Sequence, residues 1–345
     1  MQTLGPANNP ACKFSANVQT LAMNTLYRSL RIVAGLCMAL GLAHAQTTYP
    51  NKPVRIIVPF PAGGSADTLV RVVGQGLSRR WNQSVVIDNR PGGGTVIAGT
   101  LAAKSPADGY TLLVIANSLT INAKLRTNLP YDPLKAFDPI AMLVNSPQVI
   151  AVNSQSPHKT LAEFLNEAKA KPGSLSYATV GPATTQHIAG EAFKRITNTD
   201  LNYVAYTGGA LAANAVMGNH VSMVLTNLSE VAGMLESGKL RPLAVTTRER
   251  LDVLPQTPTV QELGFKDYEV AVWFALASPA GTPADVVQKL AEDLRATLTE
   301  PEIKKKLVAA GLYPAYMGPS ALAQHIQQEF VRYSRVIDEA RIKLD

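Results

Sequence analysis

Hydrophobic and polar residues follow one another along this chain in blocks that predict strands and helices in turn. Residues 54–60 are apolar and rich in β-branched side chains, which is typical of a buried parallel strand. Over residues 69–81 apolar positions recur every fourth residue, the spacing of one helix face. The segment 61–64 is predicted to turn the chain between them, with Ser65 or Asp67 as the helix cap. Such a turn leaves backbone N–H groups pointing into one crevice, which suits an anionic or polar group of a ligand.

The same order of elements repeats downstream. Residues 84–89 predict a second strand, 90–94 a second glycine turn, 95–104 a second helix and 110–116 a third strand. Alternating strands and helices predict a parallel sheet, and the turns after its strands then open on one carboxyl edge. Residues 125–138, rich in proline, asparagine and aspartate, are predicted to be irregular.

Two long extended runs, 140–152 and 268–277, are predicted to cross between two domains. Between these runs strands and helices alternate again: helix 161–171, strand 175–179, helix 186–197, strand 201–206, helix 210–218, strand 221–226, helix 228–237 and strand 240–246. Thr160 and Glu163 form a capping-box pattern before the first of these helices. Three proline-initiated helices are predicted to pack on the first domain: 283–297, 301–310 and 319–342.

The predicted fold class is therefore α/β, with two α/β lobes. Lobe I comprises residues 46–149 and 272–345, and lobe II comprises residues 150–271. The two crossings would form a hinge, and the carboxyl edges of the two sheets would face an interlobe cleft. A cleft of this kind is a natural ligand site.

The first residues predict export. Two arginines precede an apolar run at 32–42, and the small-x-small triplet 43–45 follows it, which is the pattern of a secretory signal peptide cut before Gln46. The run is too short to span a bilayer. Met23 lies closer to this pattern than the first methionine does. Residues 1–45 are thus assigned to the signal peptide, preceded by an upstream segment, residues 1–22, that is absent if translation starts at Met23. The mature protein is assigned to the periplasm.

Cysteine content and charge exclude several classes of site. Cys12 and Cys37 both lie before Gln46, so the mature chain should carry no disulfide, no cysteine nucleophile and no thiolate metal site. Three basic residues and no acid lie there too, so the net charge of the mature chain is +7 − 3 = +4. A mild, scattered positive charge fits a small anionic ligand and predicts no nucleic-acid partner.

The sequence does not match the motifs of several cofactor-binding and catalytic sites. No lysine follows either glycine cluster, as a phosphate-binding P-loop would need, and Ile97 stands where a dinucleotide fingerprint needs glycine. Asp67 stands where a hydrolase elbow would place its last glycine. The histidines show no metal-ligand spacing, so neither a cofactor nor a metal is predicted.

Ser65 and Asp67 each allow more than one role. Ser65 with His187 and an acid could form a hydrolase triad, but a helix-capping serine is the far commoner arrangement. Asp67 could be a first-turn carboxylate stabilised by the helix dipole, the partner of a ligand amine, or a general base.

Five sequence blocks, in order, resemble the Bug-type periplasmic solute receptors, the substrate-binding proteins of tripartite tricarboxylate transporters. These blocks are Y-P-N-K-P-V-R-I-I-V-P-F-P-A-G-G-S-A-D at 49–67, V-V-I-D-N-R-P-G-G-G-T-V-I-A-G at 85–99, A-K-S-P-A-D-G-Y-T-L-L at 103–113, Y-A-T-V-G-P-A-T-T-Q-H at 177–187 and Y-V-A-Y-T-G-G-A at 203–210. The resemblance covers essentially the whole of residues 46–345.

This resemblance implies a type II periplasmic-binding-protein fold whose two lobes close on a small organic carboxylate. In the family, backbone amides, hydroxyls and bound waters hold the carboxylate, rather than a basic side chain. The implied site residues are Phe60, Ala62, Gly63, Gly64, Ser65 and Asp67 in lobe I, and Thr179, Gly181, Thr184, Thr185, His187, Tyr206, Thr207, Gly208, Gly209 and Ala210 in lobe II. The implied partner is a membrane permease, and we expect the receptor to be a monomer.

The ligand is not implied by the resemblance, because the lobe II turns depart from the family pattern; Thr207, for example, replaces a commoner basic residue. A di- or tricarboxylate, an amino acid and an aromatic acid are all compatible with it. Two other functions stay open from the residues alone. One is an exported hydrolase using Ser65, and the other is a sensor that presents its closed form to a signalling partner.

Overall fold

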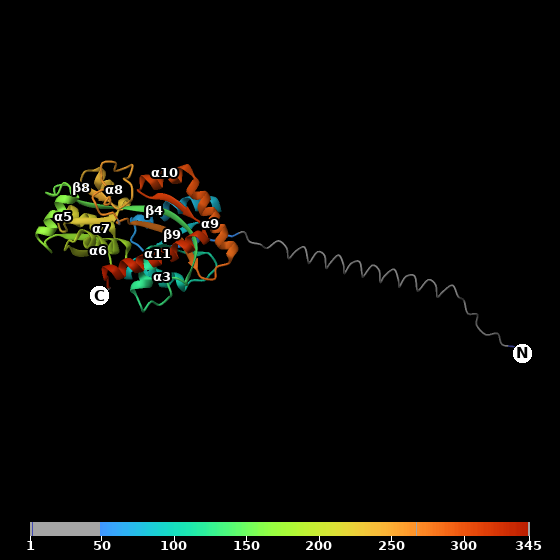
Figure 1. Ribbon diagram of the computed structural model, residues 1–345. Helices are drawn as coiled ribbons and strands as arrows, with labels where there is room; N and C mark the ends of the chain where they lie inside the picture. The colour runs from blue at the N-terminus through green and yellow to red at the C-terminus, as the bar shows by residue number, and fades with distance from the viewer. Residues whose placement is uncertain (1, 3–48, 267, 344–345) are drawn as a thin grey trace. The chain divides into compact units, whose positions relative to one another are not determined.

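Strand β4 (Phe137–Asn153) joins two sheets, because its first and last parts pair with different strands. The computed structural model describes residues 2, 49–266 and 268–343, and the chain divides into the units Met1–Asn51 and Lys52–Asp345. All the described strands and helices belong to the second unit (Figure 1). The predicted signal peptide and its cleavage before Gln46 lie outside the described residues. Among those that are described, no helix has both the length and the apolar sequence needed to cross a bilayer.

Sheet A combines parallel and antiparallel strands. Its order is β2 (Val85–Asn89), β1 (Val54–Val58), β3 (Thr111–Ala116), β9 (Ala271–Pro279) and the first part of β4, with which β10 (Tyr313–Met317) also pairs. β1 runs parallel to β2 and β3, as the alternation predicted, whereas β9 is antiparallel to β3 and β4. Strand β1 is buried at all its positions but Arg55, and Ile57 packs with Ala98 and Ala102 of the helix that follows β2.

Sheet B continues from the last part of β4. Its order is β4, β7 (Met223–Asn227), β5 (Ser176–Val180) and β6 (Asn202–Tyr206), and β8 (Leu240–Val245) also pairs with β4. β5 runs parallel to β6 and β7, and β4 is antiparallel to β7 and β8. Pairing of β4 with β9 ends at Pro147, and pairing with β7 begins at Gln148, so the two sheets meet at one point of one strand.

Helices cover both sheets. Sheet A carries α2 (Ser65–Trp81), α3 (Val96–Ala103), α4 (Ser118–Leu125), α9 (Ala284–Thr299), α10 (Pro301–Ala309) and α11 (Pro319–Ala340), and a short 3-10 turn, η2 (Gly93–Thr95), precedes α3. Sheet B carries α5 (Leu161–Ala170), α6 (Thr185–Thr197), α7 (Gly209–Met217) and α8 (Leu228–Glu236). In Figure 1, α5 to α8 gather around one end of β4, and α3, α9 and α10 lie around the other. Separate apolar clusters lie on the two faces of sheet B, one with α5 and α6 and one with α7 and α8.

The structure corrects the sequence-based elements at three places. Helix α4 and strand β10 were not predicted. The predicted side-chain cap of α2 is wrong, because Gly64 is the N-cap residue and no side chain caps it. Ser65 is instead the first helical residue, and Asp67 lies in the first turn. By contrast, the capping box of Thr160 and Glu163 at the start of α5 is confirmed.

Candidate functional site

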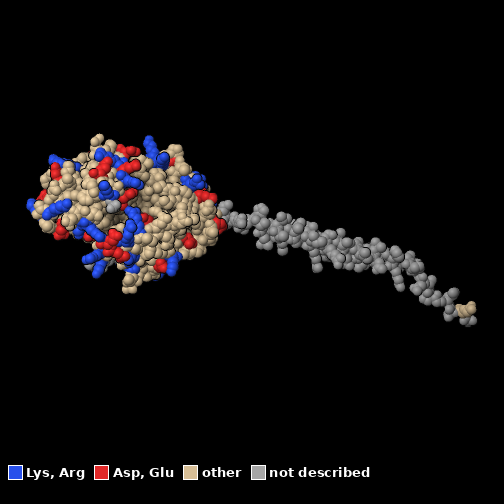
Figure 2. Space-filling model, viewed as in Figure 1, with Lys and Arg blue, Asp and Glu red and all other residues tan. Residues whose placement is uncertain are grey.

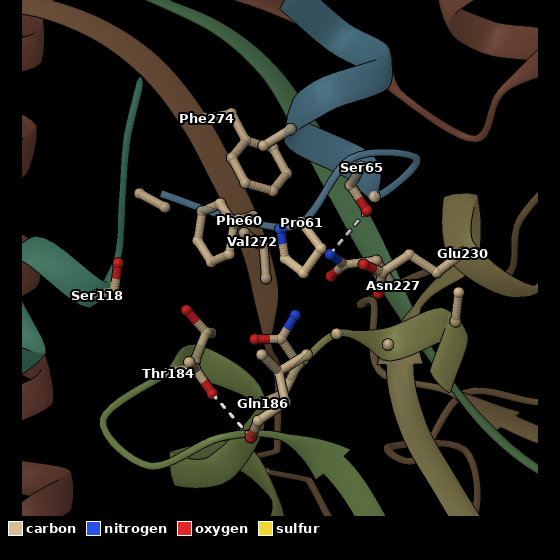
Figure 3. A pocket seen from close by; sticks show the side chains of 18 of the residues that line it. Phe60, Pro61, Ser65, Ser118, Thr184, Gln186, Asn227, Glu230, Val272 and Phe274 are labelled. Carbon is tan, nitrogen blue, oxygen red and sulfur yellow. Dashed lines mark hydrogen bonds between the residues drawn. The ribbon is translucent and has the colours of Figure 1, made fainter. Parts of the chain in front are cut away.

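A pocket lies between the two sheets, where the connections after β1, β5, β6 and β7 meet strand β9 (Figure 3). Sheet A contributes Phe60, which follows β1, and Ser118 at the start of α4. Sheet B contributes Gln186 in the first turn of α6 and Asn227 at the end of β7. Phe274 comes from β9. Because parallel strands open on one carboxyl edge, the topology alone brings connections so distant in sequence together.

One wall of this pocket is apolar. The rings of Phe60 and Phe274 meet edge to face with centroids 6.1 Å apart, and Val272 lies beside them (Figure 3). Opposite this wall, the amide of Gln186 projects into the pocket from α6 (Figure 3). No lysine or arginine is found among the described residues that line it, and Glu230 is the one charged side chain there. An apolar wall with a few placed polar groups is the usual make-up of a small-molecule site.

The structure distributes the sixteen site residues implied by the sequence over three environments. Those lining the pocket are Phe60, Ala62, Gly64, Ser65, Thr184, Thr185, Gly208, Gly209 and Ala210. Those lining an adjoining second pocket are Gly181, Tyr206 and Thr207. Those lining neither pocket are Gly63, Asp67, Thr179 and His187.

Asp67 fixes the shape of the loop between β1 and α2. Asp67 as a whole residue is 2% exposed, and its Oδ2 accepts hydrogen bonds from the Gly63 amide and from Arg71 Nε, each at 2.8 Å. Burial by itself would raise the pKa of Asp67, but the hydrogen bonds from Arg71 and Gly63 hold it below its ordinary value. Gly63 has a φ of 79°, which glycine adopts without strain. In this structure the Gly63 amide is thus bound within the loop rather than directed at a ligand.

Ser65 connects the two sheets instead of forming a triad. Its Oγ lies 2.6 Å from Ser229 Oγ and accepts a hydrogen bond from Asn227 Nδ2 at 3.0 Å. His187 lies elsewhere, with its ring centroid 4.6 Å from that of Tyr203. Its Nδ1 is buried and has no hydrogen-bond partner among the described residues. Burial lowers the pKa of His187, which keeps the imidazole neutral near pH 7. The serine and the histidine of the hydrolase hypothesis therefore do not act on each other here.

Glu230 is a pocket residue that the sequence reasoning missed. It lies in the first turn of α8, and its Oε2 accepts a hydrogen bond from Thr226 Oγ1 at 2.6 Å. The backbone amides of Ser65, Asn227 and Gly209 also donate to its carboxylate. Burial raises the pKa of Glu230 above its ordinary value, and the four hydrogen bonds offset only part of that rise.

The charged residue that lines the adjoining second pocket is an arginine, whereas the first pocket has a glutamate. The second pocket is lined by Pro91 and the glycine turn after β2, by Arg126 just beyond α4, and by Tyr206 and Thr207 after β6. Arg126 Nε donates to Asn122 Oδ1 at 2.7 Å, and no ion pair with a carboxylate within 49–266 or 268–343 engages its guanidinium. Phe60, Val180 and Thr184 line both pockets, so the two spaces are neighbours.

A family model described as the tripartite tricarboxylate transporter family receptor matches residues 69–342. The chain belongs to this receptor family. The resemblance seen in the sequence is thereby confirmed, and so is its consequence that the chain is a solute-binding protein and not an enzyme. This also removes the hydrolase alternative.

Relatives and solved structures agree with this family assignment. The receptor is 31% identical over 321 residues to Protein BugT of Bordetella pertussis (strain Tohama I), covering 92% of this chain and 98% of BugT. Its structure is similar to that of an R. palustris protein solved with adipate, with 33% identity, a TM-score of 0.83, and coverage of 86% of this chain and 99% of the other. It is also similar to MatC of Rhodopseudomonas palustris with bound malate, at 28% identity, a TM-score of 0.78, and coverage of 84% and 100%. The fold is accordingly the mixed α/β fold of periplasmic binding proteins, as predicted.

Several lining residues were missed by the sequence reasoning, Glu230 and Arg126 among them. Glu230 is an acid three residues beyond Asn227, at the start of a helix that was predicted, but the turn after that strand was not considered part of the cleft. Arg126 follows α4, which was not predicted, so nothing placed it near the glycine turn at 91–94. Phe274 and Val272 were assigned only as part of a crossing strand.

Proposed function

We propose that this receptor captures a small organic carboxylate in the periplasm and delivers it to the membrane permease of a tripartite tricarboxylate transporter. The observation that carries the proposal is the pocket between the sheets, because connections from both sheets line it together with an apolar wall. The similar R. palustris proteins were solved with adipate and with malate, which are small dicarboxylates. The ligand class for this receptor is therefore a di- or tricarboxylate, an amino acid or an aromatic acid.

Capture would use two lobes that move about a hinge. Lobe I, residues 46–149 with 272–345, would carry sheet A, and lobe II, residues 150–271, would carry sheet B. The change of partner strands along β4 between Pro147 and Gln148 supports a hinge near this point. A ligand touching both lobes makes its full set of contacts only when they are closed, and this difference drives closure.

Export and assembly follow from the same role. The signal peptide would be cleaved before Gln46, and intact-mass measurement of periplasmic protein tests this directly; a mature chain that still contains Cys37 would contradict it. We propose that the receptor acts as a monomer without nucleic acid. In support, acidic and basic side chains are interspersed on the face shown in Figure 2, without the basic stripe that nucleic acid requires.

Native mass spectrometry of freshly purified protein, followed by titration calorimetry, tests the proposal. We expect a small acid to co-purify, and one acid from a panel of di- and tricarboxylates, amino acids and aromatic acids to bind in a one-to-one complex. Adipate and malate are the first members of the panel. A folded protein that binds no acid of any class would contradict the proposed function.

A further inference from the structure

A buried hydrogen-bond network lies behind the pocket and is built on helix α11. Asn117, Trp273, Glu329 and Tyr333 are each at most 5% exposed, and none of them lines the pocket. Asn117 Nδ2 donates to Glu329 Oε2 at 3.0 Å and to the Tyr333 hydroxyl at 3.1 Å. Trp273 Nε1 donates to the same Glu329 oxygen at 3.2 Å. The network therefore fixes α11, strand β9 and the start of α4 to one another.

Members of this network are direct sequence neighbours of pocket residues. Asn117 precedes Ser118, and Trp273 lies between Val272 and Phe274; these three neighbours line the pocket (Figure 3). Side chains alternate between the two faces of a strand, so Trp273 projects from β9 on the face opposite to Val272 and Phe274. The face of β9 that meets α11 is thus the one that points away from the pocket.

Tyr333 extends the network to sheet B. Its hydroxyl forms a hydrogen bond with the side chain of Thr185, which is the first residue of α6 and lines the pocket. Its ring packs with Ala183 and Ile188, on either side of that helix start. Burial raises the pKa of Tyr333, so the phenol keeps its proton. Because Asn117 already donates to the phenol oxygen, the phenol proton is available to Thr185 Oγ1.

The two adjacent threonines at the start of α6 have different surroundings. Thr184 Oγ1 donates to Gly181 O at 2.8 Å and accepts from the His187 amide at 3.3 Å, so this hydroxyl is engaged within its own turn. The oxygen of Thr185 accepts from Tyr333 in the arrangement above, which leaves the hydroxyl hydrogen of Thr185 to donate to a ligand. A hydroxyl donor beside the start of a helix suits a ligand carboxylate.

We propose that Tyr333 is a positioning residue, which orients the Thr185 hydroxyl toward the carboxylate of the ligand. Asn117 and Glu329 hold the phenol in place for this purpose. The inference rests on the proposed function and deepens it, because Tyr333 belongs to the proposed lobe I and Thr185 to lobe II. One lobe thus prepares a ligand contact that the other lobe makes, and the preparation is lost when the lobes separate.

Tyr333→Phe removes the hydroxyl and keeps the ring. Titration calorimetry of the mature protein, with adipate, malate and the other acids of the panel as probes, should show affinity about threefold to tenfold weaker than in wild type, the effect of one net hydrogen bond. Tyr316→Phe is the matched control, because Tyr316 donates to Ala291 O at 3.1 Å and does not line the pocket. The control should leave the affinity unchanged. An unchanged affinity in folded Tyr333→Phe would overturn the inference.

A double-mutant cycle separates positioning from a general loss of packing. Thr185→Val removes the hydroxyl that Tyr333 orients, so Tyr333→Phe should have no further effect on affinity in that background. In Thr185→Ser, which retains a hydroxyl, Tyr333→Phe should keep its full effect. Equal losses of affinity in the two backgrounds would show that Tyr333 does not act through Thr185, and the inference would fail.

Hydrogen exchange followed by mass spectrometry needs no ligand. Peptides covering residues 184–192 should exchange about threefold faster or more in Tyr333→Phe than in wild type, and at the wild-type rate in Tyr316→Phe. Unchanged exchange in this segment of Tyr333→Phe would overturn the inference, whether or not a ligand has been found. If wild type binds an acid and Tyr333→Phe behaves as wild type does, only the inference fails. If no acid binds to folded wild type, the proposed function fails, and with it the role of Tyr333.

Discussion

The fit between Glu230 and its surroundings depends on the absence of a side chain at residue 209. A methyl group built on Gly209 would lie 1.9 Å from Glu230 Oε2 and 2.0 Å from Thr226 Oγ1. No such approach is tolerated between real atoms, so Gly209→Ala must displace the carboxylate from its amide donors. Overpacking of this kind costs about 1–3 kcal/mol.

We therefore expect Gly209→Ala to lower the free energy of unfolding by about 1–3 kcal/mol in urea titrations and to weaken ligand binding. Gly233→Ala is the matched control, because Gly233 is exposed on α8 and a methyl group built there meets nothing within 4 Å. That control should raise stability by about 0.5–1 kcal/mol through helix propensity. Equal effects of the two substitutions would contradict the packing described around Glu230.

His187 should make stability depend on pH. Because burial lowers its pKa, the folded protein binds fewer protons at this site than the unfolded chain, whose histidine titrates near 6.5. Stability attributable to the neutral ring is thus present above about pH 6.5 and lost as the pH falls from there toward the lower pKa of the folded state. Unfolding midpoints of wild type and His187→Gln, measured from pH 8 to pH 5, should converge as the pH falls. Parallel curves would show that His187 is not the group responsible.

At the scale of single residues, the sequence predicted which residues lie near the pockets better than it predicted which atoms form hydrogen bonds. The glycine-containing connections after β1, β5 and β6 were recognised, and most of the residues named in them line one of the two pockets. Asp67 and Gly63 were named among the implied site residues, and in the structure the Gly63 amide donates to the Asp67 carboxylate. Which acceptor an amide reaches depends on distances that sequence spacing does not contain.

Local sequence rules are strongest at the ends of helices. At the start of α5, Thr160 Oγ1 accepts from the Glu163 amide at 3.2 Å, and Glu163 Oε2 accepts from the Thr160 amide at the same distance. These bonds satisfy amides that have no partner inside the helix. Thr160→Ala should therefore lower the free energy of unfolding by about 1 kcal/mol.

Urea unfolding followed by circular dichroism measures this effect, and Thr127→Ala, an exposed threonine that begins no helix, is the control. The control should change stability by less than about 0.5 kcal/mol. If both substitutions have the same effect, the capping box does not stabilise α5.

Elements that depend on contacts with distant parts of the chain were not predicted from the sequence. Helix α4 has eight residues, several of them serine, threonine or asparagine, whose intrinsic helix propensity is low. It forms where it packs against α11, which lies some two hundred residues later. Strand β10 contains Pro314, and proline disfavours a strand; β10 forms by pairing with β4 at the edge of sheet A. Tertiary packing decides both elements.

At the scale of the whole Lys52–Asp345 unit, direct contacts between the two sheets would oppose opening about the proposed hinge. Ser65 in α2 meets Ser229 and Asn227 from sheet B, as described above. A second contact is apolar: Ile121 of α4 and Tyr333 of α11 cluster with Ala183 and Ile188 beside the start of α6. If the lobes open as proposed, these contacts are lost, so they would favour the closed form even without a ligand.

Ser65→Ala tests how much these contacts, compared with the ligand, stabilise the proposed closed form. The substitution removes two hydrogen bonds between the sheets and leaves the bonds within each sheet untouched. A net hydrogen bond contributes about 0.5–1.5 kcal/mol, and 1 kcal/mol changes a two-state ratio by about fivefold. The variant should thus populate the open form more than wild type does and should require more ligand to close.

Small-angle scattering of the mature protein measures the radius of gyration with and without a saturating probe that calorimetry has shown to bind. We expect the radius to fall on binding in both proteins, and to be larger without ligand in Ser65→Ala than in wild type. Ser237→Ala is the control, because Ser237 Oγ donates to Gly233 O within sheet B's own helix α8 and not across the sheets. If wild type and Ser65→Ala scatter identically with and without ligand, the two lobes behave as one rigid body, and binding cannot signal to a permease by closure.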